Sequence, residues 1–80
     1  MFKDSFVFMD KNGIIVHFRD VNGKRFHKVW QNVTEFQSFN WDEYDDENYE
    51  ILLVEWGKHC IYNALSNEKI YLEDLIGYFA

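Results

Sequence analysis

Residues 10–30 read DKNGIIVHFRDVNGKRFHKVW, with one Asn-Gly pair near the start and another ten residues later. An Asn-Gly pair between apolar stretches favours a β-hairpin, because a type I′ turn requires positive φ at both central residues. Two such turns at this spacing predict a three-stranded antiparallel meander. We expect its strands at residues 5–10, 14–20 and 24–30.

The two faces of this meander can be assigned if each Asn-Gly pair forms a two-residue loop, because cross-strand partners then share a face. One face is largely aliphatic and should lie under a helix: it holds Val7, Met9, Val16, Phe18, His27 and Val29. The other mixes rings with cations and should be half-solvated: it holds Phe6, Phe8, Ile15, His17, Arg19, Phe26, Lys28 and Trp30. A one-residue bulge would exchange these assignments.

Two later segments have helical signals. Asn32 and Glu35 stand at the spacing of a capping box and predict a short helix that ends near Asn40. Apolar residues recur at the i, i+3, i+4, i+7 spacing of an amphipathic helix near the C-terminus, at Leu72, Leu75, Ile76 and Phe79.

Between these helices, the apolar run at residues 51–54 is typical of a buried central strand. A turn at Gly57 leads to a further strand at residues 59–63. The expected fold is therefore α+β, in which a small antiparallel sheet carries one or two short helices on one face. The sheet combines the N-terminal three-stranded meander with a C-terminal hairpin.

Length and composition limit the class of protein. Eighty residues are enough for one domain, which we expect to span residues 1–80. The single cysteine, Cys60, allows no internal disulfide and fits a reducing compartment. The N-terminus carries charges too early for a secretory signal, and no apolar run reaches the ~18 residues of a membrane span. These features predict a soluble, cytoplasmic protein.

The chain is acidic, with 14 Asp and Glu residues against 8 Lys and Arg residues and a net charge of −6. Direct nucleic-acid binding depends largely on Lys and Arg neutralising phosphates, so this chain is a poor candidate for it. Its charge suits a basic protein partner, including one that itself binds nucleic acid. We expect no membrane partner.

No pattern for catalysis, a cofactor or a metal is present. The Asp-x-Asn-Gly segments at residues 10–13 and 20–23 lack the flanking acids of a calcium loop. His59 and Cys60 are adjacent, and neighbouring strand residues point to opposite faces, which disfavours a zinc site. The sequence thus predicts a protein that is not an enzyme and has no cofactor.

Residues 41–50, which we name the acidic segment, are the strongest candidate for a binding site. They hold six acids, no base and three aromatic rings. The candidate partner-binding residues are Trp41, Asp42, Glu43, Tyr44, Asp45, Asp46, Glu47, Tyr49 and Glu50. One interpretation is a solvated loop whose rings lie in the core. A weak calcium or magnesium site is another alternative.

The functional interpretation is that these carboxylates occupy the phosphate-binding groove of a nucleic-acid enzyme, while the tyrosines stack on its arginines. Small acidic inhibitors of this kind are typical of phages and mobile elements, where they disarm restriction or CRISPR nucleases. The alternative is a protein-interaction module or homodimer that uses an exposed aromatic sheet face. A toxin antagonist of the immunity type belongs to this second group.

Overall fold

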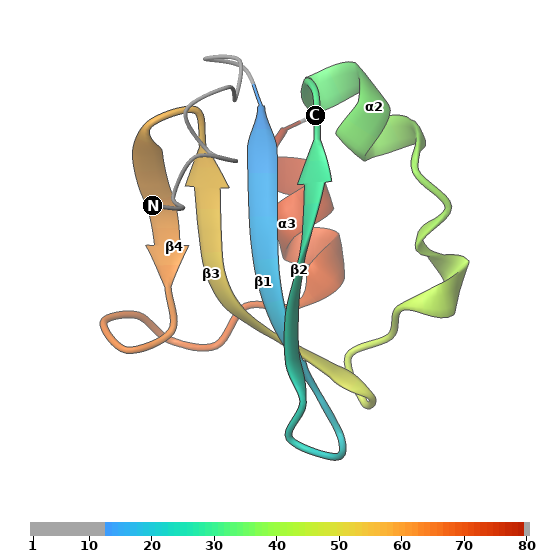
Figure 1. The fold of residues 1–80 in the computed structure, drawn as a ribbon, viewed down its shortest axis with the longest axis vertical. Helices are drawn as coiled ribbons and strands as arrows, with labels where there is room; N and C mark the ends of the chain where they lie inside the picture. Colours follow the sequence, from blue (N-terminus) through green and yellow to red (C-terminus); the bar gives the residue numbers. More distant parts are fainter. Residues whose placement is uncertain (1–12, 80) are drawn as a thin grey trace.

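The computed structural model describes residues 13–79. Its strands are β1 (Ile14–Asp20), β2 (Arg25–Trp30), β3 (Tyr49–Trp56) and β4 (His59–Asn63). Its helices are α2 (Val33–Ser38), the short 3₁₀ helix η1 (Trp41–Glu43) and α3 (Leu72–Tyr78). In this part of the chain the strands form one antiparallel sheet in the order β2-β1-β3-β4 (Figure 1).

The α+β fold class is confirmed, with α2 and α3 as the short helices beside an antiparallel sheet. The second and third strands of the expected meander are present as β1 and β2, and the C-terminal hairpin is β3 with β4. The strand expected at residues 5–10 lies outside the described residues. No helix between residues 13 and 79 is both long enough and apolar enough to cross a lipid bilayer.

The β1–β2 connection contains three residues rather than two. The Asp20 N–H donates to the Lys24 carbonyl at 2.9 Å, which leaves Val21, Asn22 and Gly23 in the loop. Gly23 has a φ of 83°, the left-handed conformation that the last residue of a three-residue hairpin loop adopts. The Asp20 carboxylate also accepts hydrogen bonds from the Asn22 and Lys24 N–H groups, both at 2.9 Å, and so holds the loop.

This third loop residue makes the sequence-based face assignment of β2 wrong. Val16 pairs with Lys28 and Phe18 with Phe26, so β2 is displaced by one residue from the expected register. Because side chains alternate along a strand, that single step moves all of β2 to the opposite face. His27 and Val29 lie on the face with Ile15, His17 and Arg19, and both are exposed.

Phe18, Phe26 and Trp30 therefore lie on the face that packs against the helices, which we name the inner face. In Figure 1, α3 lies behind the sheet. The core combines residues of the inner sheet face with residues of both helices: Ile14, Val16, Phe18, Trp30, Phe36, Ile51, Val54, Tyr62, Leu72 and Leu75. The Trp30 and Phe36 rings meet edge to face, 4.9 Å between centroids, which joins β2 to α2.

Local signals explain both helices. The Asn32 side chain accepts a hydrogen bond from the Glu35 N–H at 2.9 Å, as expected of an N-cap. Glu35 in turn accepts one from the Gln31 N–H at 3.2 Å. The helix ends at Ser38, two residues earlier than predicted. Leu72 and Leu75 of the predicted C-terminal stripe are buried in the core.

Strand β3 is longer than its apolar run, because Tyr49 and Glu50 also pair with β1. The pairing of β1 and β3 is interrupted by a bulge at Leu52, since His17 pairs with Leu53 and Phe18 with Ile51. Strand β4 has the predicted bounds.

Candidate protein-binding site

The acidic segment connects α2 to β3 and runs beside β2 before it enters the sheet (Figure 1). It begins as η1, whose first turn is capped by the Asn40 side chain accepting from the Asp42 N–H at 3.1 Å. It then turns at residues 45–48, where the Tyr49 N–H donates to the Asp45 carbonyl at 3.0 Å. The segment therefore has defined backbone structure at both ends.

The three rings of the acidic segment are packed against the core. Trp41 is half-buried, and its indole N–H donates to the Phe36 carbonyl at 3.0 Å. The Tyr44 ring is stacked on Phe18 at 5.7 Å between centroids and lies 4.9 Å from the Tyr49 ring. These rings anchor the segment to the inner sheet face and do not form a projecting aromatic surface.

Three of the six carboxylates also have structural partners. Asp45 accepts hydrogen bonds from the backbone and side-chain nitrogens of Asn48, at 2.8 to 3.0 Å. Asp46 accepts a hydrogen bond from the Leu72 N–H at 2.8 Å and so caps the first turn of α3. Glu50 forms an ion pair with Arg19 of β1.

The other three carboxylates point to solvent. Asp42, Glu43 and Glu47 are exposed. Within the described part of the chain, none of their carboxylates has a hydrogen bond or an ion pair. The nine predicted residues thus divide into three rings packed against the core, three acids with partners inside the protein and three acids available to a partner protein.

Two lysines border this surface. The Lys28 ammonium lies 5.6 Å from the centroid of the Tyr44 ring and 5.9 Å from that of Phe39. Lys69 lines a shallow hollow of about 190 Å³ together with Glu47 and the Arg19–Glu50 pair. A lysine therefore lies beside the Tyr44 ring, and another lines the hollow that Glu47 lines.

The described residues contain no group of three or more His, Cys, Asp or Glu side chains arranged to hold a metal ion. The contact that sequence reasoning missed is the cap of α3 by Asp46, which joins residues 26 positions apart. No local signal marks that contact, because it depends on the position of α3 beside the acidic segment.

No family model, curated protein or solved structure matches this chain. The inference of function therefore depends on the surface chemistry of the protein itself.

Proposed function

We propose that this protein binds a basic partner protein through the exposed carboxylates of its acidic segment, and that the partner is an enzyme acting on nucleic acid. The observation that supports this proposal is that the rings and the acids of the segment have different roles. Trp41, Tyr44 and Tyr49 anchor it, while Asp42, Glu43 and Glu47 are exposed and form no ion pair with another described residue.

Anchoring matters because binding costs less conformational entropy when the binding groups are already held in place. A flexible acidic tail would have to be ordered on binding, whereas η1 and the turn at residues 45–48 are ordered beforehand. Carboxylates form charge-assisted, often bidentate hydrogen bonds with arginine. A surface of arginines evolved for phosphates therefore also fits an array of carboxylates.

The competing function, an interaction module with an aromatic sheet face, has less support. Phe18, Phe26 and Trp30 lie on the inner face, packed against other rings, and Trp30 and Phe18 are almost fully buried. Among the described aromatic residues, Tyr71 and Tyr78 are exposed, and both belong to the α3 region rather than to the sheet.

The experiment is affinity capture with three proteins: the unchanged chain, a double variant Glu43→Gln/Glu47→Gln, and a control Glu35→Gln/Glu55→Gln. Both variants lose two negative charges. The control spares the acidic segment, and glutamine keeps an oxygen acceptor for the Gln31 N–H and for His17. Capture is measured at about 50 mM and about 500 mM salt, since screening weakens exposed charge pairs.

The expected result is a nucleic-acid-binding enzyme that the unchanged chain and the control retain at low salt. It should be released by high salt and by added duplex DNA or RNA, and the Glu43→Gln/Glu47→Gln variant should not retain it. Equal retention by both variants would show that these carboxylates are not the binding surface.

A further inference from the structure

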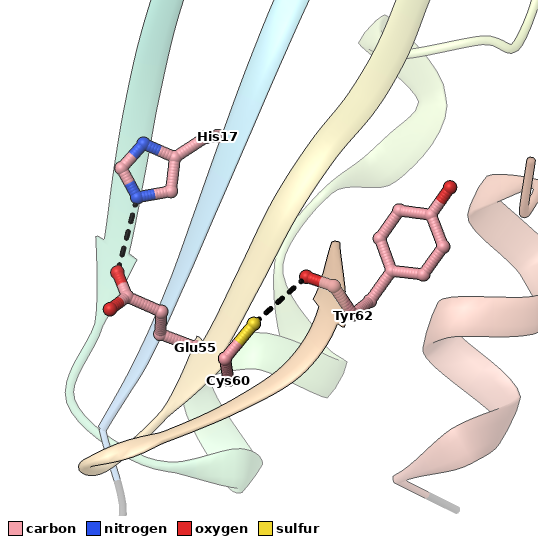
Figure 2. Close-up of polar contacts among 4 residues, drawn as sticks. All are labelled: His17, Glu55, Cys60 and Tyr62. Carbon is pink, nitrogen blue, oxygen red and sulfur yellow. Dashed lines mark hydrogen bonds and ion pairs between the residues drawn. The ribbon is translucent and has the colours of Figure 1, made fainter. Parts of the chain in front are cut away.

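The face of the sheet opposite the helices carries a second charged feature. We name it the outer face; His17, Arg19, Arg25 and His27 lie on it in adjacent positions of β1 and β2. Figure 2 shows His17 and Glu55 directed toward one another on this side, while the Tyr62 ring points toward α3 on the other. In a chain with a net charge of −6, this concentration of basic side chains is unusual.

Two hollows adjoin on the outer face. One has a volume of about 330 Å³ and is lined in part by His17, Arg25 and His27. The other, of about 320 Å³, extends to Ala64 and Leu65 after β4. Arg25, Leu52 and Leu53 line both hollows, so the two form one continuous depression that runs from the edge strand β2, where Arg25 lies, across β3. Neither lining includes an acidic residue.

Two leucines at the bulge in β3 contribute to the apolar part of this depression. Leu52, which has no pairing partner on β1, and its neighbour Leu53 both contribute to the lining. Both leucines are half-buried, and Leu65 at the far end is 95% exposed. The depression therefore offers apolar surface that extends from Arg25 across β3 to Leu65.

Arg25 has no partner of its own within the described residues. Its cross-strand neighbour is Arg19, and like charges in that position repel one another. Glu50 is paired with Arg19, and Glu55 lies 3.2 Å from His17 Nε2, so the two nearby carboxylates are engaged elsewhere. The His17 and His27 rings lie 5.6 Å apart beside the same hollow. The Arg25 guanidinium thus has five N–H donors available to a ligand.

We propose that this depression binds a small oxyanion carried on an apolar group, such as a carboxylate or a phosphate ester of a short hydrocarbon. The oxyanion accepts hydrogen bonds from the Arg25 guanidinium, and the apolar group covers Leu52 and Leu53. Each hollow is within the size range of small-molecule sites, about 300–1,000 Å³. The site is separate from the acidic segment, so this proposal does not depend on the proposed function.

The test is a titration of the full chain, followed by backbone amide chemical shifts, with four probes. Hexanoate and phenyl phosphate carry an oxyanion on an apolar group, acetate lacks the apolar group, and hexylamine reverses the charge. Hexanoate, phenyl phosphate or both should cause saturable shifts at Arg25, Leu52 and Leu53, with a Kd on the order of 1 mM. Comparison of the two distinguishes a carboxylate site from a phosphate site.

Three variants test the role of Arg25. Arg25→Gln should weaken the binding by about tenfold, and Arg25→Lys should weaken it less, because a lysine keeps the charge but loses the planar fork. Lys24→Gln removes the same charge one residue earlier, outside the lining, and should leave the Kd unchanged. Arg25 is exposed and its side chain makes no hydrogen bond or ion pair within residues 13–79, so its variants should keep the amide spectrum elsewhere.

Three outcomes would overturn the proposal. One is the absence of saturable shifts with both apolar oxyanions. Another is equal weakening by Arg25→Gln and Lys24→Gln, which would reveal general charge attraction. The third is binding of hexylamine as tight as that of hexanoate, which would leave the oxyanion without a role.

Discussion

Asp46 shows how one side chain can contribute to the fold although it lies in a segment selected for its charge. Its carboxylate accepts a hydrogen bond from the Leu72 N–H. This is one of the N–H groups in the first turn of α3, and such groups have no hydrogen-bond partner within the helix. Glu47, the next residue, has the same charge but is exposed. Adjacent acids of one segment thus have different physical roles.

We predict that Asp46→Ala lowers the free energy of unfolding by about 1 kcal/mol, the usual cost of losing a side chain that caps a helix. Urea unfolding measures this value. Glu47→Ala should change stability by less than about 0.5 kcal/mol, as exposed substitutions usually do. If both substitutions had the same small effect, the contact between Asp46 and α3 would contribute nothing to stability.

At the scale of elements, the β1–β2 loop determines which side chains reach the core. With three loop residues, Trp30 is opposite Ile14 and faces the helices; with two, His27 and Val29 would take the inner positions. Val21 itself is 65% exposed and makes no core contact. Its importance lies in the length that it adds to the loop.

We predict that deletion of Val21 destabilises the protein by at least about 3 kcal/mol, because the displaced register would remove Trp30 from the core. The substitution Val21→Thr keeps the loop length and should change stability by less than about 0.5 kcal/mol. Both values come from urea unfolding. A deletion variant as stable as the substitution would mean that the hairpin can restore its register elsewhere.

At the scale of the whole molecule, charge is distributed between two surfaces. The acidic segment lies beside the edge strand β2, whereas His17, Arg19, Arg25 and His27 lie on the outer face of the sheet. Exposed like charges repel one another and lower the stability of a compact state. The acidic segment therefore carries a stability cost that a purely structural loop does not require.

We predict that Glu43→Gln/Glu47→Gln leaves the free energy of unfolding unchanged or raises it by up to about 0.5 kcal/mol at low salt, because it relieves this repulsion. Urea unfolding at about 20 mM and about 500 mM salt measures the effect, which should disappear at the higher concentration. A loss of stability in this variant would show that the two glutamates help to hold the fold.

Several structural features could be predicted from local residue patterns. The cap at Asn32, strand β4, the central strand β3 and the buried leucines of α3 all follow from neighbouring residues. The face of β2 could not be predicted in the same way, because Asn-Gly permits loops of two or three residues. The hydrogen bonds of the Asp20 carboxylate hold the longer loop.

The sequence by itself determined the class of the fold, the position of its helices and the excess of acids in residues 41–50, since these depend on composition and short-range spacing. The tertiary structure alone decided which of those acids face solvent and on which face of the sheet the Arg25 guanidinium lies. The partners of Asp46 and Glu50 come from α3 and β1, 26 and 31 residues away. Contacts at such separations depend on strand register and helix docking, which only the folded chain specifies.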